Sequence, residues 1–520
     1  MGVFQQPATQ APGARMEALV SMVDSVVRFV RRRGLGVGIV LVWVAMMGRL
    51  THLHDPGSSI AALSTGAAEP GQAFDEWMGI YYQGKKVGYG HRSFGPEGDG
   101  WRSREQMYVE MVAQGFPLEV SMRTEGLTGP DLGLRSFDFT LQSGLVDTQI
   151  QGRVEGNILK LDLVTAGTRS SQSMELTTRP TLPGSLSLLI RKQTLQAGKK
   201  FSLPVLDPAT LSLREMVVEV KGEDFVDLEG EAVPCYRLSA SYAGVSVDFW
   251  VNSSGETIRE NTPLGWELVR ESREKALTEG WDSKVRIDVV NATSVGVQGA
   301  RIADPRGTRF LSVLFPPDST EGLDLSGERQ ELKPGQFPLL YVRREDLKGL
   351  KPISIPVDQP EMRTFLGSDL FIQADHPEVI EQAKRIVGDE KDSLAVAGLL
   401  ARWVHDNLEK RVIPSLPSAL EVLHRRAGDC NEHTVLYVAL ARALGLPART
   451  NVGLVFVEDR FYYHAWPEVY VGQWVALDPV FDQLPADATH IRILRGGLER
   501  QMEIVRLIGK LKTLNVIAVQ

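Results

Sequence analysis

The sequence predicts a multi-domain protein with an N-terminal membrane helix, an antiparallel β-rich middle region and a C-terminal α+β domain. Three observations predict this architecture. An uncharged apolar run follows a block of arginines near the N-terminus, apolar and polar residues alternate through the middle of the chain, and the spacing becomes helical near residue 361. The length of 520 residues agrees, because a structural unit usually holds about 150 residues and three or four units are then expected.

The composition excludes several classes of protein. Apolar residues make up 43% of the chain and charged residues 23%, which is typical of a globular protein with sizeable cores. The net charge of −8 leaves no basic surplus to neutralise a phosphate backbone, so nucleic acid is not expected as a partner. Cys235 and Cys430 are the two cysteines, and two cysteines make neither a Cys-rich scaffold nor a four-cysteine zinc site. We expect neither a cofactor nor a metal.

The first predicted element is a membrane segment at residues 34–50, between a basic tail (1–33) and a linker (51–73). Because most nearby arginines precede the apolar run, the positive-inside rule predicts a cytoplasmic N-terminus. We therefore expect a single-pass anchor in the inner membrane, with the bulk of the chain periplasmic or otherwise extracytoplasmic. A cleaved signal peptide remains an alternative, because the uncharged run of residues 34–48 spans about 22 Å and a hydrocarbon core about 30 Å.

Residues 74–290 form the predicted β-rich domain. Period-two alternation recurs, for example from Val245 to Val251, and Gly and Asn turns separate the runs. The pattern from Trp250 to Gly255 resembles the strand-turn units of half-barrel envelope proteins that carry lipoproteins or lipids; a spacer or recognition domain is equally open. Cys235 has no base beside it, so we expect a buried, inert thiol. Residues 291–360 are expected to form a β connector or a small domain.

Residues 361–520 form the predicted C-terminal α+β domain. Apolar residues at helical spacing predict helices from Ile380 to Val387, from Leu394 to Leu408 and from Ser418 to Leu423. A further helix with Leu436, Leu440 and Leu444 on one face ends at Gly445. Counting back from that end places Cys430 in its first turn.

The position of Cys430 suits a nucleophile. The reactive form of cysteine is the thiolate, and a thiol with a pKa of about 8.5 is only a few per cent ionised at pH 7. A helix N-terminus carries about half a positive charge and unpaired N–H groups, which stabilise an anion and can donate to an oxyanion. We therefore expect Cys430 to be activated as a thiolate, with the help of a neighbouring imidazolium.

Two strands after this helix supply a base and a carboxylate. The run from Arg460 to Val471 predicts one strand, with His464 in it, and the run from Trp474 to Pro479 predicts the next, with Asp478 in it. Cys, His and Asp in this order can act as nucleophile, general base and orienting group. A two-residue turn at Gly472-Gln473 would place Asp478 opposite Pro467, about 10 Å from His464 along the strand, so we expect a bulge, with Pro467 as its place.

Four motifs in the same order resemble the transglutaminase-like superfamily of papain-like thiol enzymes. They are Gly428-Asp429-Cys430, the run from Ala441 to Arg449, His464-Ala465-Trp466 with Glu468, and Trp474 followed by Asp478-Pro479. The run from Ala486 to Ile491 is similar to the bacterial branch of that family. The resemblance covers roughly residues 361–500.

The resemblance implies a papain-like fold in which Cys430 is the nucleophile, His464 the base and Asp478 its orienting partner. It also implies a thioester acyl-enzyme, formed from a glutamine or peptide carbonyl and released to water or to an amine. The exported layout favours a peptidase or amidase over amine transfer, acting on a protein or peptide of the cell envelope.

Several alternatives remain open from the sequence. His433 could share the helix face of Cys430 and act as a base or a metal ligand, although one Cys and two His make a poor zinc site. His490 is expected to make a structural hydrogen bond, and Trp466 and Trp474 to pack the strands. Glu468 could tune the site or face solvent. The alternative function is a non-catalytic envelope scaffold that binds peptides or partner proteins.

Overall fold

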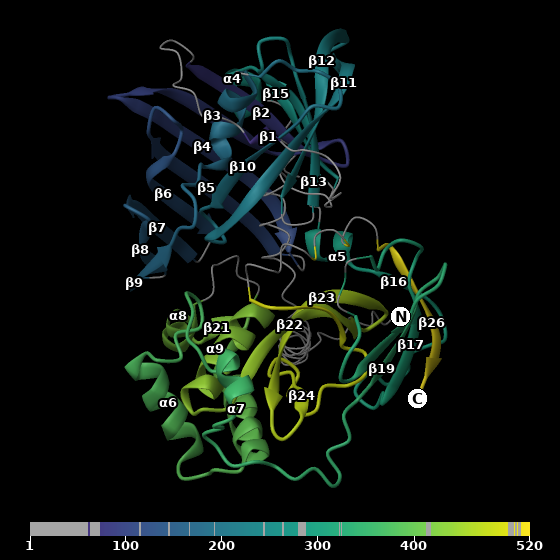
Figure 1. Ribbon diagram of the computed structural model, residues 1–520. Helices are drawn as coiled ribbons and strands as arrows, with labels where there is room; N and C mark the ends of the chain where they lie inside the picture. Colours follow the sequence, from purple (N-terminus) through teal and green to yellow (C-terminus); the bar gives the residue numbers. More distant parts are fainter. Residues whose placement is uncertain are drawn as a thin grey trace, which may run out of the picture.

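The computed structural model describes residues 61–62 and 73–520, except 114–115, 144–145, 166, 192, 243–244, 263–264, 279–287, 322, 324, 412–417, 498–503, 505–506 and 508–510. Figure 1 shows three β structures: a large sheet, a small sheet near the C-terminus, and a sheet flanked by helices. Strands account for 50% and helices for 18% of the structure. The described protein is therefore dominated by strands.

The large sheet has fifteen strands in the order β1-β10-β11-β12-β13-β14-β15-β2-β3-β4-β5-β6-β7-β8-β9. Its neighbouring strands pair antiparallel, except β1 with β10. The strands are β1 (Ala61–Ala62), β2 (Phe74–Tyr82), β3 (Lys85–Glu97), β4 (Gly100–Ala113), β5 (Phe116–Thr128), β6 (Leu134–Ser143), β7 (Val146–Glu155), β8 (Ile158–Thr165), β9 (Thr168–Glu175), β10 (Lys200–Asp207), β11 (Ser212–Leu228), β12 (Glu231–Tyr242), β13 (Val245–Val251), β14 (Thr257–Asn261) and β15 (Trp266–Glu271). Four short helices accompany them: η1 (Pro183–Ser185), α3 (Leu186–Arg191), α4 (Arg273–Thr278) and α5 (Val289–Thr293).

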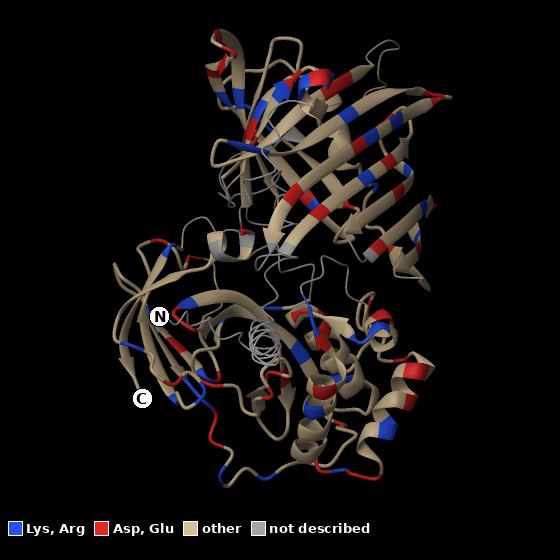
Figure 2. Ribbon diagram, turned by 180° about the vertical axis from the view of Figure 1, so that it is seen from behind, with Lys and Arg blue, Asp and Glu red and all other residues tan. Residues whose placement is uncertain are grey.

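Local sequence explains the strands of the large sheet. In β13, buried and half-buried residues alternate, as the period-two pattern predicts. The turn between β7 and β8 has two residues, and Gly156 adopts φ +64° there, a conformation that glycine reaches without steric cost. The ribbon colours of Figure 2 show acidic and basic residues interspersed along these strands. Opposite charges pair across them, as in Arg102 with Glu125.

The small sheet has five strands in the order β16-β26-β17-β19-β18. They are β16 (Gly296–Gly299), β17 (Phe310–Leu314), β18 (Gln330–Lys333), β19 (Leu339–Arg343) and β26 (Thr513–Val519). The last strand of the chain thus returns to the region of residues 291–360, where it lies parallel to β16 and antiparallel to β17.

The third sheet has four strands in the order β24-β23-β22-β25, and helices cover it. The strands are β22 (Ala448–Val457), β23 (Arg460–Tyr470), β24 (Trp474–Ala476) and β25 (Ile491–Arg495). The helices are η2 (Pro360–Phe365), α6 (Pro377–Val387), α7 (Ser393–Asn407), α8 (Ala419–Arg425) and α9 (Cys430–Ala443), with a two-stranded pair β20 (Glu409–Lys410) and β21 (Ala427–Gly428). Figure 1 shows α6 to α9 grouped on one side of β22 to β24 and the small sheet on the other.

Helix α9 is the centre of this part of the protein. It packs against α6, α7 and α8 as well as against β22 and β23, and Leu436, Val438 and Leu440 have no exposed surface. The helix ends where the sequence predicts, with Gly445 at φ +75° just beyond it. A helix held from all sides is a rigid support for a residue at its N-terminus.

The structure corrects the predicted fold class and localisation. No helix among the described residues is long and apolar enough to cross a membrane, so the membrane helix and the single-pass inner-membrane placement are not supported. The predicted membrane segment at residues 34–50 itself lies outside the described residues. The physical reason was already in the sequence, because a run of about 22 Å is shorter than the hydrocarbon core.

Candidate active site

Cys430 is the first residue of α9, and its neighbours fix the start of that helix. The Asp429 side chain accepts a hydrogen bond from the amide of Asn431 at 2.8 Å, and the Glu432 side chain accepts one from the amide of Asp429 at 2.8 Å. This capping box satisfies amides that the first helical turn leaves without partners. Cys430 therefore lies at the N-terminus of a capped helix, and only 1% of its surface is exposed.

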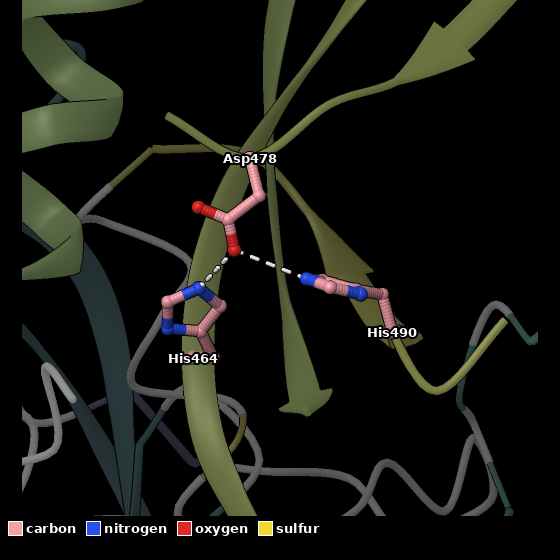
Figure 3. A group of neighbouring side chains, drawn as sticks. All are labelled: His464, Asp478 and His490. Carbon is pink, nitrogen blue, oxygen red and sulfur yellow. Dashed lines mark hydrogen bonds and ion pairs between the residues drawn. The ribbon is translucent and has the colours of Figure 1, made fainter. Parts of the chain in front are cut away.

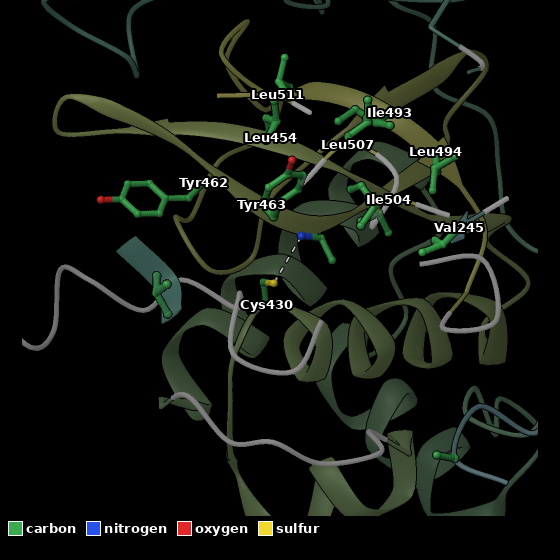
Figure 4. Close-up of a cluster of buried hydrophobic side chains, with 14 of the residues drawn as sticks. Val245, Cys430, Leu454, Tyr462, Tyr463, Ile493, Leu494, Ile504, Leu507 and Leu511 are labelled. Carbon is green, nitrogen blue, oxygen red and sulfur yellow. Dashed lines mark hydrogen bonds between the residues drawn. The ribbon is translucent and has the colours of Figure 1, made fainter. Parts of the chain in front are cut away.

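Strand β23 meets this helix end at the residue after His464. The amide of Ala465 donates to Sγ of Cys430 at 3.3 Å, and this hydrogen bond is the dashed line that ends at Cys430 in Figure 4. The donor is available because β24 pairs only with residues 468 to 470 of β23, so the edge at Ala465 is open toward α9. The α9–β23 contact thus places the thiol beside the backbone of the strand that carries His464.

Asp478 holds the ring of His464. Nε2 of His464 and Oδ2 of Asp478 are 2.7 Å apart, and both side chains are buried. Nδ1 of His464 is buried and has no hydrogen-bond partner among the described residues. Since the carboxylate can only accept, Nε2 carries the hydrogen and Nδ1 is the basic nitrogen.

The prediction of a bulge at Pro467 is wrong. The β22–β23 register runs without a shift through Pro467, which faces Thr450, and the β23–β24 register is also regular. Tyr470 pairs with Trp474, so the turn has three residues and not two. Continuing this register brings Asp478 opposite Trp466, two residues from His464, and the chain leaves the ladder there through paired hydrogen bonds between Asp478 and Gln483.

A second histidine shares the Asp478 carboxylate, as Figure 3 shows. Nε2 of His490 lies 3.0 Å from Oδ2 of Asp478, and its Nδ1 lies 3.2 Å from Oδ1 of Asp487. The other Asp478 oxygen, Oδ1, accepts from the amides of Val480 and Phe481. The site is therefore a continuous buried chain from Asp487 through His490 and Asp478 to His464.

His464, Asp478 and His490 bring three atoms of the kind that bind metals within 4.8 Å of one another. Ligands of a tetrahedral zinc ion stand about 3.3 Å apart, with their lone pairs directed at the metal. Here Oδ2 of Asp478 lies 2.7 and 3.0 Å from the two nitrogens, which are hydrogen-bond distances. The arrangement fits shared hydrogens better than a metal ion.

The charges of the site differ from the sequence expectation at Cys430. Burial raises the pKa of the Cys430 thiol well above its usual range, and the Asp429 and Asp478 carboxyls add to this, although the Ala465 amide opposes it. Burial together with Glu432 also raises the pKa of Asp429. The resting site thus favours a neutral thiol, and the predicted thiolate is wrong for this state because desolvation outweighs the helix N-terminus.

The charges around Asp478 follow the opposite direction. Burial alone would raise the pKa of Asp478, but the contacts with His464 and His490 outweigh it and hold that pKa below its usual range. Burial would likewise lower the pKa of His490, but Asp487 and Asp478 raise it to about 9. Asp478 is therefore a carboxylate and His490 an imidazolium at neutral pH.

The other predicted residues are outside the hydrogen-bonded chain from Asp487 to His464, although the ring of Trp466 packs against the rings of His464 and His490, with centroids 6.1 and 5.2 Å apart. His433 bonds the carbonyl of Asp429 through Nδ1 at 2.6 Å, and burial lowers its pKa to about 4. Glu468 neither tunes His464 by contact nor faces solvent, because it is buried and pairs with Arg449 at 2.7 Å. Trp466 is fully buried, as strand packing predicts, whereas Trp474 stacks under the Arg449 guanidinium at 3.8 Å.

Cys235, His424 and His405 each contact a neighbouring group. Cys235 is free and buried, as expected, with Sγ donating to the carbonyl of Val233 at 3.0 Å. His424 pairs with Glu378 at the surface. His405 is half-buried, and its Nδ1 lies 3.0 Å from the carbonyl oxygen of Pro479.

The structural hydrogen bond predicted for His490 is confirmed, but sequence reasoning missed Asp487 and did not place His490 beside Asp478. The run Asp487-Ala488-Thr489-His490 carried a signal, since two polar side chains three residues apart precede the apolar strand β25. What it lacked was the contact with Asp478, which the turn after β24 creates. Thr489 completes the loop by donating its amide and hydroxyl to Oδ1 of Asp487 at 2.8 and 2.6 Å.

Comparison with known proteins places this site in a family context. Residues 380–479 match the sequence profile of the transglutaminase-like superfamily. The matched segment runs from α6 to the residue after Asp478, so it contains Cys430, His464 and Asp478 but neither Asp487 nor His490. The chain matches no curated protein.

The solved structures that align with parts of this chain share little sequence with it. One, from Cytophaga hutchinsonii, is described as a proposed cysteine protease; it is 16% identical, with 44% of this chain and 82% of that chain covered and a TM-score of 0.25. A beta-barrel-like protein of unknown function from Brucella abortus is 10% identical, with 38% and 94% covered and a TM-score of 0.30. A proposed protease from Parabacteroides distasonis is 11% identical, with 73% and 64% covered and a TM-score of 0.18.

The family profile confirms the resemblance inferred from the motifs, for the part of the chain that it covers. Residues 380–479 carry a transglutaminase-like domain.

Proposed function

We propose that this protein is a cysteine hydrolase that acts on amide or peptide carbonyls through a thioester acyl-enzyme. Cys430 is the nucleophile, His464 the general base and acid, and Asp478 the group that orients His464. The observation that carries the proposal is the hydrogen bond from Nε2 of His464 to Asp478 beside the contact of Cys430 with Ala465. It leaves Nδ1 of His464 as the nitrogen that exchanges a proton with the thiol.

The reaction proceeds in two halves. Sγ of Cys430 attacks the carbonyl carbon while its proton moves to Nδ1 of His464, and the C–N bond then breaks as that proton passes to the departing amine. In the second half, water attacks the thioester, His464 takes a proton from the water, and the thiolate leaves and regains that proton. Asp478 stabilises the imidazolium in both halves because its carboxylate stays ionised. No cofactor is needed.

The buried neutral thiol determines the timing of proton transfer. Because the pKa of Cys430 is raised, loss of its proton is coupled to attack and does not precede substrate binding. Because only 1% of Cys430 is exposed, the residues over the thiol must move before a substrate reaches it. The substrate that we propose is a peptide or protein segment. We propose water as the main acyl acceptor, with transfer to an amine as the competing outcome.

The test compares the full-length chain with Cys430→Ala and uses Cys235→Ala as a matched control, because Cys235 is also a buried thiol. Each protein is incubated with a mixture of unmodified peptides, with and without a fluorescent primary amine, and the products are identified by mass spectrometry. We expect hydrolysed amides with wild type and Cys235→Ala and none with Cys430→Ala. Equal product from wild type and Cys430→Ala would contradict the proposal, and amine-linked products in excess would reverse the preference for water.

One observation favours a second function, a non-catalytic scaffold that binds peptides. A thiol that is buried and held neutral suits a structural role as well as a reactive one. An electrophilic peptide that traps thiol nucleophiles separates the two. Intact-mass measurement shows a covalent adduct at Cys430 for an enzyme, whereas a scaffold binds the peptide reversibly and keeps its mass.

A further inference from the structure

His490 is held differently from an ordinary packed histidine. Both of its ring nitrogens face carboxylates, Nε2 toward Asp478 at 3.0 Å and Nδ1 toward Asp487 at 3.2 Å, and its side chain has no exposed surface. An ionised carboxylate can only accept a hydrogen bond, so each nitrogen must carry a hydrogen. The ring is then an imidazolium fixed between two negative charges.

Both carboxylates are held in their ionised form. Burial opposes the charge of Asp487, but His490, Thr489 and Gln483 lower the pKa of Asp487 to about 2. Gln483 donates to Oδ2 of Asp487 at 2.9 Å and accepts from its amide at 3.0 Å, and the backbone of Gln483 pairs with Asp478. One loop thus fixes Asp478 and Asp487 at the spacing that a single imidazolium spans.

Resting on the proposed function, we propose that His490 is a positioning residue for the catalytic pair. Its imidazolium fixes the Asp478 carboxylate on His464 and sets the pH range in which Cys430 and His464 exchange a proton. Oδ2 of Asp478 receives both imidazoles, so the charge of His490 acts on His464 through the same oxygen atom. The ring centroids of the two histidines are 6.0 Å apart.

The magnitude follows from one unit charge at that separation. Coulomb's law gives a shift of about 0.5 pH units at the dielectric of water and about 2 units at an effective dielectric of 20. Removing the positive charge makes every nearby proton harder to lose. The pH profile of the Cys430–His464 pair should then move to higher pH by about 0.5 to 2 units.

Other charged groups near the pair stay in place in this comparison. From α9, Asp429, Glu432 and His433 lie around Cys430. From α7, His405 contacts the carbonyl of Pro479. From the segment before β18, Arg329 donates to the carbonyl of Asp487 at 2.6 Å and lies 3.5 Å from Glu345. None of these groups is changed by a substitution at His490, so a shift reports the lost imidazolium.

Two neutral variants separate charge from hydrogen bonding. In His490→Gln, the amide nitrogen takes the place of Nε2 and can still donate to Asp478. In His490→Asn, it takes the place of Nδ1 and can still donate to Asp487. His91→Gln is the matched control, because His91 pairs with Asp75 at 2.9 Å on the large sheet, remote from Cys430.

The first measurement is the protonation state of His490 in the full-length chain. Histidine is labelled with ¹⁵N, and the His490 signals are assigned by their loss in His490→Gln. At pH 7.5 we expect both ring nitrogens to carry hydrogens. A neutral ring at this pH would overturn the proposal.

The second measurement is the rate of Cys430 alkylation by iodoacetamide between pH 5 and 8, in a Cys235→Ala background, because His490 keeps its charge below its pKa of about 9. We expect the profile of His490→Gln and His490→Asn to move up by about 0.5 to 2 pH units, and that of His91→Gln to coincide with the parent. Circular dichroism verifies that each variant is folded, and one folded neutral variant is enough for the comparison with the parent. A folded variant with an unmoved or lowered profile would show that His490 is only structural.

Alkylation needs no substrate, so this result is independent of turnover. If the profile shifts but Cys430→Ala leaves peptide hydrolysis unchanged, the role of His490 stands and the proposed function fails. If Cys430 carries hydrolysis but the profile does not move, the proposed function stands and the role of His490 fails.

Discussion

The substitution Asp478→Asn changes one atom of the proposed triad and moves the basic nitrogen of His464 from Nδ1 to Nε2. Oδ1 of Asp478 accepts from the amides of Val480 and Phe481, and Oδ2 receives Nε2 of His464 and Nε2 of His490. An asparagine must keep its oxygen toward the two amides, because an amide NH₂ there would face two donors. Its NH₂ group then points at His464, which has to accept at Nε2 and carry its hydrogen on Nδ1. That tautomer cannot take a proton from Cys430.

The expected loss can be worked from the distance. A carboxylate 2.7 Å from an imidazolium nitrogen stabilises it by about 6 kcal/mol at an effective dielectric of 20. Since each 1.36 kcal/mol is tenfold in rate, this sets an upper limit of roughly 10⁴-fold. The same substitution in a Ser-His-Asp triad lowers kcat by about 10⁴. We expect kcat/KM of Asp478→Asn to fall by about 10³ to 10⁴-fold.

The assay is peptide hydrolysis by the full-length chain, with Asp482→Asn as the control. Asp482 lies four residues on, is exposed, and has φ +52°, a left-handed conformation that asparagine also tolerates. We expect this control to keep the wild-type kcat/KM. If folded Asp478→Asn kept more than a tenth of the wild-type value, the assignment of Asp478 as the orienting group would be refuted.

Two further predictions concern stability. Asp429→Ala removes the N-cap of α9 and should lower the free energy of unfolding by about 1 to 2 kcal/mol. Asp429→Asn keeps a cap oxygen and should lower the free energy of unfolding by less. Urea unfolding measures both losses, and equal losses would show that the cap oxygen does not contribute to stability. Because the folded pKa of His490 is about 9 and that of an ordinary histidine about 6.5, its imidazolium contributes stability that is complete below pH 6.5 and is lost as the pH rises through 9. The difference in unfolding free energy between wild type and His490→Gln should therefore shrink from pH 6 to 9.5, and a constant difference would argue against a buried imidazolium.

Local patterns determined the elements that carry the site. The apolar spacing before Gly445 placed Cys430 at the first turn of a helix, and the run from Arg460 to Val471 placed His464 on a strand. The next predicted strand is present as β24, but it ends at Ala476, two residues before Asp478. The alternation from Val245 to Val251 likewise predicted a strand of the large sheet, which is β13. These predictions hold because hydrophobic period, capping and turn residues act over a few neighbouring residues.

The wrong predictions concern features that the local sequence pattern does not determine. The membrane helix was inferred from the uncharged run of residues 34–48, which at about 22 Å is shorter than a hydrocarbon core of about 30 Å, and no helix among the described residues is long and apolar enough to cross a membrane. The turn after β23 has one residue more than its Gly-Gln pair suggested, which moved Asp478 opposite Trp466 without a bulge. A one-residue change in a turn shifts the register of everything that follows.

The sequence by itself determined which side chains could be nucleophile, base and orienting carboxylate. Only the tertiary structure decided their charge, because burial from all sides of α9 keeps the Cys430 thiol neutral despite the helix N-terminus. Only the tertiary structure brought His490 and Asp487 to Asp478 as well. The physical reason is that desolvation and charge pairing depend on which groups meet in space, and residues far apart in the sequence determine both.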